Sequence, residues 1–337
     1  MSMSFAEEAV QPKKAASSAD VAELLQWYAN LLMIRRAEER LISLFADGEI
    51  PGFIHLGIGQ EAMSVGIMSA LTPADTIAST HRGHGHALAK GVSARAFFAE
   101  LMGKETGLCR GRGGSMHVAD MSIGMLGANG IVGAGISVAL GSALAHKSLR
   151  RDAIAVAFFG DGALAEGILH ECLNLSALMK LPLLFVCESN GWSEFSPTTK
   201  QIAFSLEKLA AAHAIPYARI DGNDVVAVST MARESVAPIR TGNGPRIIEC
   251  TTCRVRGHHE GDSQKYRSVA ELSSLSAHDP IRLAVDRLAE AAVSNDELER
   301  IAEKIDAEIE GAIAAAQSAA PPDFARAIAD VYTARGV

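Results

Sequence analysis

The sequence lacks the features of several protein classes. None of its apolar runs approaches the roughly 20 residues that cross a bilayer. Lysine and arginine number 31 against 39 acidic residues, and the net charge of −8 disfavours a nucleic-acid-binding protein that relies on bulk charge. The residues through about Ser18 are polar and lack the apolar core of a secretory signal, so we expect a flexible arm on a cytoplasmic protein.

Cysteine is scarce, and its spacing gives no disulfide framework. The five cysteines, which form no pair pattern of a secreted scaffold, are Cys109, Cys172, Cys187, Cys250 and Cys253. Cys250 and Cys253 make a C-x-x-C pair, but they lie in a strand-like run and no second pair completes a zinc site. We therefore expect reduced thiols without a metal or redox role.

Nucleotide-binding signatures are also missing. No G-K-S/T element and no G-x-G-x-x-G element follows any strand-like run, which disfavours ordinary nucleotide binding. The chain is, however, long and apolar enough to form a sizeable hydrophobic core. Its 337 residues, of which 48% are hydrophobic, are enough for one large α/β domain or two modest ones.

The most informative stretch lies between residues 153 and 190. Its parts, in order, are an apolar run (153–159), Gly160-Asp161-Gly162, a helix-like segment (163–180), a second apolar run (183–187) and Glu188-Ser189-Asn190. A strand–helix–strand unit of this kind places its two strands side by side and parallel. We therefore predict a doubly wound, mostly parallel α/β sheet with helices on both faces, and Asp161 and Asn190 at one crevice on its carboxyl edge.

The chemistry of this stretch suits a metal-bound diphosphate. Gly160 and Gly162 allow a tight turn whose amides point at a ligand, and the helix N-terminus that follows favours a phosphate group. Asp161 and Asn190 each offer a hard oxygen ligand of the kind that magnesium prefers. G-D-G alone is a weak motif, but G-D-G followed by 27 residues and then asparagine is much more specific.

Other strand-like runs also end in polar, glycine-rich segments. They are 76–79 before 80–86, 217–220 before 221–224, and 246–250 before 254–262. Together with the two strands above, they predict a ligand crevice along one sheet edge. His81, Arg82, His84 and His86 leave two interpretations open, a metal site or a cationic edge that faces an anion. The second fits better, because no carboxylate or cysteine lies nearby in sequence.

Glycine is concentrated between residues 103 and 135. Ten of the 30 glycines fall in these 33 positions, where about three would be expected, so we predict mostly irregular, functional backbone. The helix expected over 135–148 repeats small residues every four positions, at Gly135, Ala139 and Ala143 and again at Gly141 and Ala145. Tight packing within the chain and a subunit interface both stay open as reasons for this repeat.

Helices are expected at both ends of the chain. Asp20 is the expected N-cap of the first helix, and the residues expected on its solvated face are Arg35, Arg36, Glu38, Glu39 and Arg40. From residue 279 the chain is alanine-rich and helical, with Ser294 and Glu297 as a capping box. We predict three parts: a flexible arm (1–19), an α/β domain (20–278) and a C-terminal helical extension packed on that domain (279–337).

The central stretch resembles the thiamin-diphosphate fingerprint, and the chain from about residue 23 to 335 is similar to the alpha subunit of two-chain, thiamin-dependent 2-oxo acid and acetoin dehydrogenases. The supporting motifs are Ile50-Pro51-Gly52-Phe53, Gly59-Gln60-Glu61-Ala62, His81-Arg82-Gly83-His84-Gly85, 111–117, 129–133 and Tyr266-Arg267. These motifs are long and collinear. The resemblance implies the thiamin-diphosphate-binding fold, with thiamin diphosphate and Mg²⁺ as cofactors.

The resemblance also implies roles for individual residues. Magnesium would be bound by Asp161, the Asn190 side chain and the Trp192 carbonyl. Besides Asp161 and Asn190, the cofactor-binding residues would be His81, Arg82, Gly130, Ile131, Val132, Gly162, Ala163 and His258. The expected catalytic side chains, which would donate a proton or stabilise charge, are those of His55, His81 and His258.

The sequence departs from the family pattern at positions that bear on the substrate. Ser189 replaces the first of two paired asparagines, which leaves the metal ligand Asn190 in place. His81 stands where the family often has tyrosine, and Gly191-Trp192 replaces a more usual pair. The loop Glu260-Gly261-Asp262 is more similar to acetoin dehydrogenase than to pyruvate-type members.

Finally, the resemblance implies a half-site. In this family the glutamate that activates thiamin belongs to the beta subunit; Glu61 is one candidate in this chain, but its motif is typical of alpha subunits. We therefore expect the alpha subunit of an acetoin dehydrogenase, an oxidoreductase of two alpha and two beta chains that passes a two-carbon unit from acetoin to a lipoyl acyltransferase. The alternatives are a pyruvate or branched-chain 2-oxo acid dehydrogenase, a split transketolase-like enzyme, a non-catalytic scaffold, or a metal hydrolase built on the histidines of 81–86.

Overall fold

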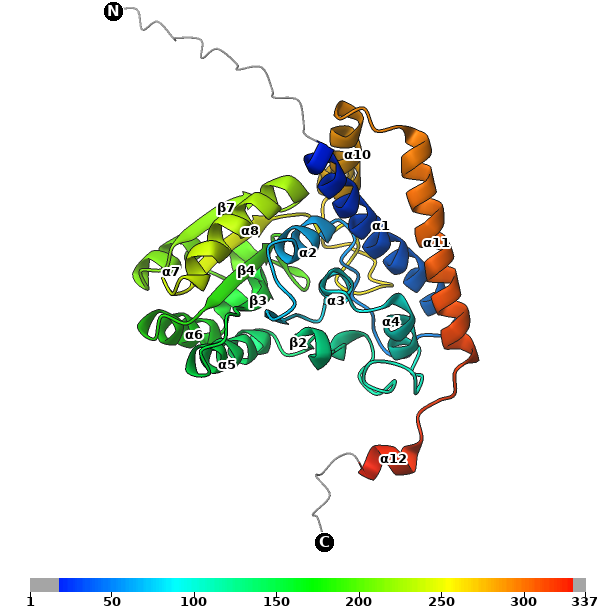
Figure 1. The fold of residues 1–337 in the computed structure, drawn as a ribbon, viewed down its shortest axis with the longest axis horizontal. Coiled ribbons are helices and arrows are strands. Elements are labelled where there is room, and N and C mark those ends of the chain that lie inside the picture. The colour runs from blue at the N-terminus through cyan, green and yellow to red at the C-terminus, as the bar shows by residue number, and fades with distance from the viewer. Residues whose placement is uncertain (1–17, 330–337) are drawn as a thin grey trace, which may run out of the picture.

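A computed structural model describes residues 18–329, and its centre is a six-stranded parallel sheet (Figure 1). The strands are β1 (Thr76–Ala78), β2 (Met125–Gly127), β3 (Ala155–Gly160), β4 (Leu183–Ser189), β7 (Tyr217–Asp221) and β8 (Arg246–Thr251). Their order is β2-β1-β3-β4-β8-β7, and every neighbouring pair is parallel. Because the strands are parallel, all their carboxyl ends lie at one edge of the sheet.

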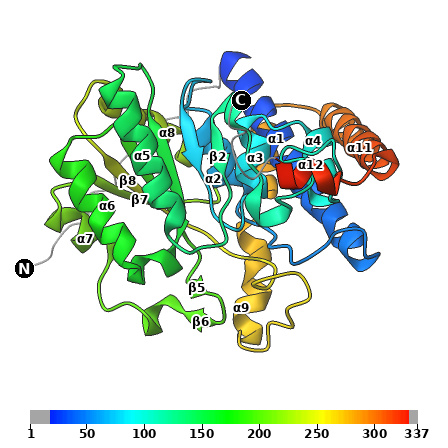
Figure 2. The same ribbon diagram turned by 90° about the horizontal axis from the view of Figure 1, so that it is seen from below.

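Helices cover both faces of this sheet (Figures 1 and 2). One face carries α5 (Ala134–Ser148), α6 (Gly167–Leu178) and α7 (Leu206–Ala212), and the other carries α2 (Glu61–Met68) and α8 (Val225–Arg240). The side chains of β3 alternate accordingly: Val156 and Phe158 belong to the core under α2 and α8, and Ala155, Ala157 and Phe159 to the core under α5 and α6. A strand buried on both faces reads as a continuous apolar run. The predicted doubly wound α/β fold is confirmed.

The remaining elements lie outside these two layers. They are the helices α1 (Ser18–Ala46), α3 (His84–Lys90), α4 (Ala94–Leu101), α9 (Val269–Ser274), α10 (Pro280–Glu290), α11 (Asn295–Ser318) and α12 (Phe324–Ala329), the 3-10 turns η1 (Ser115–His117), η2 (Met121–Ile123), η3 (Asp161–Ala165), η4 (Thr198–Lys200) and η5 (Leu275–His278), and the hairpin strands β5 (Trp192–Ser193) and β6 (Ser196–Pro197). No helix between residues 18 and 329 combines the length and apolar character that a bilayer span requires.

The C-terminal helices pack against the N-terminal one. In Figure 1, α10 and α11 run beside α1, and buried side chains such as Leu288 and Ile309 join the same core as Leu31 of α1. Ser294 caps α11 as predicted, since its hydroxyl accepts a hydrogen bond from the Glu297 amide at 3.3 Å. The arm predicted for 1–19 lies almost wholly outside the described residues, as does the chain beyond 329. The division into three parts therefore stays a prediction.

Two predicted helix starts are wrong. Helix α1 begins at Ser18, so Asp20 lies in its first turn and is not its N-cap. The helix expected directly after Gly162 is a short 3-10 turn, η3, and α6 begins only at Gly167. Glu166 between them has an extended backbone (φ −83°, ψ 131°), which interrupts the helical hydrogen bonds. A phosphate at this position would therefore meet the amides of a 3-10 turn rather than those of an α-helix.

One row of small residues in α5 serves packing within the chain, whereas Gly141 and Ala145 of the other row are exposed. Gly135, Ala139 and Ala143 are all buried against the sheet. A Cβ atom on Gly135 would lie 2.8 Å from the backbone oxygen of Ser79, closer than real Cβ atoms approach a neighbour. This contact explains the glycine without a subunit interface.

A buried carboxylate organises the glycine-rich segment after α4. Glu100 is fully buried, and its two carboxylate oxygens accept four backbone amide hydrogen bonds at 2.6 to 3.1 Å. The donors are the amides of Cys109, Gly111, Gly113 and Gly114. These amides have no strand or helix partner, so the carboxylate takes the place of secondary structure.

We predict that Glu100→Gln destabilises the chain by roughly 2–5 kcal/mol, because the new amide group cannot accept the two hydrogen bonds that one carboxylate oxygen holds. The free energy of unfolding in urea measures this. The matched control is Glu105→Gln in the same segment, where the carboxylate pairs with Arg326 at the surface, at 3.3 Å. That change is expected to cost less than about 1 kcal/mol. Equal effects for the two variants would contradict the assignment.

Candidate active site

The carboxyl ends of β1, β3 and β4 and the loop after β8 surround a cavity of about 270 Å³. All the residues expected to bind the cofactor, bind the metal or act in catalysis line it. They are His55, His81, Arg82, Gly130, Ile131, Val132, Asp161, Gly162, Ala163, Asn190, Trp192 and His258. The structure thus brings together the whole predicted site, and the roles of these residues stay predictions.

One of the five strand ends does not reach this cavity. The residues after β7 were expected at the crevice, but β7 is an edge strand of the sheet. Asp221 instead accepts hydrogen bonds from Asn223, and Asp224 caps α8 through the amide of Val226. The expectation was wrong because polar residues after a strand also serve as helix caps and turns.

Asp161 has the features of a cation ligand. Its Oδ2 atom accepts hydrogen bonds from the Gly191 amide at 2.8 Å and the Thr198 hydroxyl at 2.6 Å. Its Oδ1 atom is buried and has no hydrogen-bond partner. Burial raises the pKa of Asp161 to about 6, against the lowering effect of these hydrogen bonds. A cation beside Oδ1 would satisfy this atom and return the pKa to its ordinary range.

Asn190 and Trp192 lie where the chain leaves β4 and enters the β5–β6 hairpin. The Asn190 side-chain oxygen accepts a hydrogen bond from the Trp192 amide at 3.1 Å. Gly191 between them has φ +81°, a conformation that favours glycine. Gly162 is needed for a different reason, since a Cβ there would lie 2.6 Å from the Ser193 hydroxyl oxygen. The hairpin therefore sits directly over the Gly160-Asp161-Gly162 turn.

Three histidines meet on the other wall of the cavity. The ring centroid of His55 lies 4.8 Å from that of His81 and 5.0 Å from that of His258. Burial, with a further contribution from the Arg82 charge, lowers the pKa of His55 to about 3, that of His81 to about 2 and that of His258 to about 4. One nitrogen of each ring is buried without a hydrogen-bond partner. All three are therefore neutral at pH 7 and have a free ring nitrogen.

These three rings also suit a metal by distance, since their candidate ligand atoms lie within 4.8 Å of one another. The charges beside them favour an anion instead. Arg82 and Arg254 are both buried next to the rings, and their charges lower the pKa of His258. A dication would meet the same repulsion, whereas a diphosphate would be attracted.

The other two histidines of the 81–86 segment point away from the cavity lining. The rings of both are buried and hydrogen-bonded at both nitrogens. His84 contacts Glu38 at 3.1 Å and Ser115 at 2.7 Å. His86 contacts Ser79 at 2.7 Å and Glu188 at 3.1 Å. The metal hydrolase built on this segment therefore has no support, because only His81 reaches the cavity.

Arg82 holds two segments of the cavity wall together. Its guanidinium donates to the Leu56 carbonyl at 2.5 Å and to the His258 carbonyl at 3.1 Å. These carbonyls come from chain segments that precede α2 and follow β8, and they carry His55 and His258. One buried cation therefore sets the spacing of two of the three histidines.

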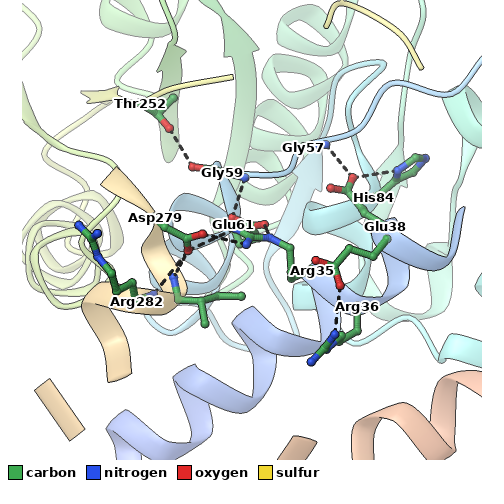
Figure 3. A network of polar contacts seen from close by, with 12 residues as sticks. Arg35, Arg36, Glu38, Gly57, Gly59, Glu61, His84, Thr252, Asp279 and Arg282 are labelled. Atoms are coloured by element: carbon green, nitrogen blue, oxygen red, sulfur yellow. Dashed lines mark hydrogen bonds and ion pairs between the residues drawn. The ribbon is translucent and has the colours of Figure 1, made fainter. Parts of the chain in front are cut away.

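Arg35 and Glu38 of α1 take part in polar contacts behind this wall (Figure 3). Arg35 contacts Glu61 at 2.6 Å and Asp279 at 3.0 Å, and Glu61 also accepts from the Gly59 amide at 3.0 Å. Glu38 accepts from the Gly57 amide at 2.7 Å. The predicted solvated face is therefore wrong for Arg35 and Glu38, whereas Arg36, Glu39 and Arg40 do lie at the surface. Glu61 is committed to this network and does not line the main cavity, which argues against it as the activating glutamate.

The chain is similar in sequence to proteins of one known family. The model of the dehydrogenase E1 component family matches residues 29–325. The chain belongs to the dehydrogenase E1 component family. Its relatives include the alpha subunits of acetoin:2,6-dichlorophenolindophenol oxidoreductase from Bacillus subtilis (42% identical, 95% of this chain and 96% of the relative) and from Cupriavidus necator (43%, 94% and 96%). The pyruvate dehydrogenase E1 component subunit alpha of Rhizobium meliloti is 39% identical over 98% of this chain and 97% of that protein.

This dehydrogenase E1 chain is thus a subunit of a thiamin-diphosphate-dependent oxidoreductase, as the resemblance implied. The fold and enzyme class predicted from sequence are confirmed. Sequence reasoning missed the residues that hold the site together, above all Arg35, Glu38 and Glu100. Their partners lie in segments distant in sequence or are backbone amides of irregular segments, and neither leaves a pattern in the sequence.

We predict that Asp161→Asn stabilises the cofactor-free chain at pH 8 and not at pH 4. The raised pKa of Asp161, about 6, means that its ionised form destabilises the fold; this loss of stability grows from about pH 4 to pH 6 and is complete above that. Thermal unfolding midpoints at the two pH values measure the difference. Asp152→Asn, at an exposed position, is the control and is expected to change neither midpoint. If Asp161→Asn raised the unfolding midpoint as much at pH 4 as at pH 8, the prediction would be contradicted.

Proposed function

We propose that the chain is the alpha subunit of a thiamin-diphosphate-dependent acetoin dehydrogenase. It would act in an assembly of two alpha and two beta chains and pass the two-carbon unit from acetoin to a lipoyl acyltransferase. The observation that carries the proposal is the cavity at the carboxyl edge, where the predicted metal ligands face a wall of neutral histidines. The two acetoin-oxidoreductase relatives, at 42% and 43% identity over nearly their whole length, support the same substrate.

The residues present fit the cofactor. Asp161, Asn190 and the Trp192 carbonyl would hold Mg²⁺, which the unpartnered Oδ1 atom of Asp161 supports. The diphosphate would lie near Arg82, within reach of the backbone of 130–132 and of 162–163. Bound thiamin diphosphate would supply the carbon nucleophile that adds to a substrate carbonyl.

Acetoin and a 2-oxo acid require different chemistry from the three histidines that line the cavity. Cleavage of acetoin between its two oxygen-bearing carbons requires a base that takes the hydroxyl proton, whereas decarboxylation does not. His258 is neutral, and its Nδ1 atom is buried without a partner, so this atom would accept the proton. A bound diphosphate would raise the low pKa of His258 toward neutrality and make it a stronger base. His55 and His81 would orient the substrate beside it.

The guanidinium groups beside the cavity are partly occupied by the protein itself. Arg82 donates to two backbone carbonyls, and Arg254 donates through one nitrogen to the Glu194 carbonyl and the Tyr266 hydroxyl, each at 3.0 Å. The Nε atom of Arg254 is buried without a partner. The cofactor diphosphate and a substrate carboxylate would compete for these positive charges, whereas neutral acetoin would not.

A partner chain is needed to complete the site. Among the carboxylates that line the cavity in residues 18–329, Asp161 is held by the hairpin and Glu188 by His86, and Glu194 lies exposed on the hairpin. Large apolar side chains of the cavity lining are also exposed, Ile131 by 71% and Val132 by 49%. A beta subunit would cover this surface and bring the activating glutamate. The five free cysteines suit a reducing cytoplasm.

Reconstitution with the beta subunit tests this proposal. We expect no turnover by the alpha chain alone, and faster turnover of acetoin than of pyruvate by the pair, measured as reduction of an artificial electron acceptor. Faster turnover of pyruvate would favour the decarboxylating alternative, which the Rhizobium relative represents. Ketol transfer between sugar phosphates would favour a split transketolase. If the pair did not bind thiamin diphosphate, the result would favour a non-catalytic scaffold.

We predict that His258→Asn lowers kcat for acetoin by roughly 10²–10⁴, because it removes the proton acceptor. Thiamin diphosphate affinity, measured by calorimetry, is expected to change far less than kcat. His278→Asn, at an exposed position in η5, is the control and should leave both quantities unchanged. A variant with normal kcat would show that another group takes the hydroxyl proton.

A further inference from the structure

The β5–β6 hairpin is closed by contacts between its two ends. Trp192 pairs with Pro197 and Ser193 with Ser196 in antiparallel register. The Thr198 amide then donates to the Gly191 carbonyl at 2.9 Å. The hairpin is short, and a two-stranded ribbon of this size has little stability of its own. Something outside it must hold it in place over the cavity.

Asp161 is that outside contact. Both residues that close the hairpin donate to the same atom, Oδ2 of Asp161, from the Gly191 amide at 2.8 Å and the Thr198 hydroxyl at 2.6 Å. The two donors fix the rotation of the carboxyl group. Its second oxygen, Oδ1, is left buried and without a hydrogen-bond partner, on the cavity lining.

We propose that Thr198 is a positioning residue for the metal site. Its hydroxyl holds Oδ2 of Asp161 so that Oδ1 is presented to the cation, and it ties closure of the hairpin to the occupation of that site. This inference rests on the proposed function, since it takes Asp161 as a magnesium ligand. No contact of Thr198 with substrate is involved; it acts through Asp161 and through the hairpin.

A chain of contacts also connects the hairpin to His258. The Trp192 indole donates to Glu271 at 2.8 Å, and its ring lies 5.1 Å from that of Tyr266. The Tyr266 hydroxyl donates to Asp262 at 2.6 Å, and Asp262 also accepts from the His258 amide at 2.8 Å. A hairpin released from Asp161 would therefore loosen the segment that carries His258.

The chain provides a matched control in the next residue. Thr199 is also in η4, is exposed and makes no side-chain hydrogen bond within residues 18–329. Thr198→Val keeps the shape of the side chain and removes the hydroxyl, and Thr198→Ser keeps the hydroxyl. Thr199→Val makes the same chemical change where no carboxylate is near. If Thr198 acted only through backbone conformation or general packing, the loss of its hydroxyl would not distinguish Thr198→Val from Thr198→Ser and Thr199→Val.

The first experiment titrates Mg²⁺ into the alpha–beta assembly at a fixed concentration of thiamin diphosphate and follows cofactor binding by calorimetry. For Thr198→Val we expect the Mg²⁺ concentration at half-saturation to rise roughly tenfold, which is the loss of one hydrogen bond to a charged group. Thr198→Ser should stay within about twofold of the parent, since its hydroxyl restores that bond. Thr199→Val should match the parent. An unchanged Mg²⁺ requirement for Thr198→Val overturns the proposal.

The second experiment follows amide hydrogen exchange of residues 191–198 in the alpha chain without cofactor. Thr198→Val should speed exchange of these amides, including that of Gly191, while Thr199→Val leaves it unchanged. Equal protection in Thr198→Val and the parent overturns the proposal, even if the assembly binds no thiamin diphosphate. Absence of cofactor binding by the parent assembly would instead contradict the proposed function. The two failures are thus distinguishable.

Discussion

The walls of the cavity depend on charged side chains that replace secondary structure. Several segments around it belong to no helix or strand, and their amides and carbonyls still need partners. Glu100 accepts four amides from one such segment, and Arg82 donates to carbonyls of two others. Glu38 and Glu61 each accept one amide in the same way. Each of these four charged groups is buried.

This construction makes the cavity stiff where its chemistry requires it. A buried charge that is fully hydrogen-bonded is expensive to displace, because moving it leaves both the charge and its partners unsatisfied. The three histidine rings are held in contact by backbone that Arg82 fixes at two points. Their neutrality follows from the same arrangement, since burial and the nearby guanidinium groups both disfavour a further positive charge.

The sheet and the list of cavity residues could be predicted from sequence, and the supporting residues could not. A strand buried on both faces leaves a continuous apolar run, and the spacing of Asp161 and Asn190 follows from one strand–helix–strand unit. Glu38 on a long helix is indistinguishable by pattern from a solvated glutamate. Its burial depends on Gly57 and His84, which come from other segments. Strand β2 is three residues long in a glycine-rich segment, too short to leave a periodic signal.

Two ionisable groups of the site have pKa values shifted in opposite directions. The pKa of Asp161 is raised because its carboxylate is buried, and the pKa of His258 is lowered because its ring is buried and lies near the charges of Arg82 and Arg254. A cation alone would relieve the first and worsen the second, and an anion alone would do the reverse. A magnesium diphosphate, which carries both charges in one ligand, would oppose both pKa shifts at once. Because that relief exists only in the folded chain, it would add to stability as well as to affinity. Burial thus raises the pKa of Asp161 and lowers that of His258, and a ligand with a positive and a negative part would oppose both shifts.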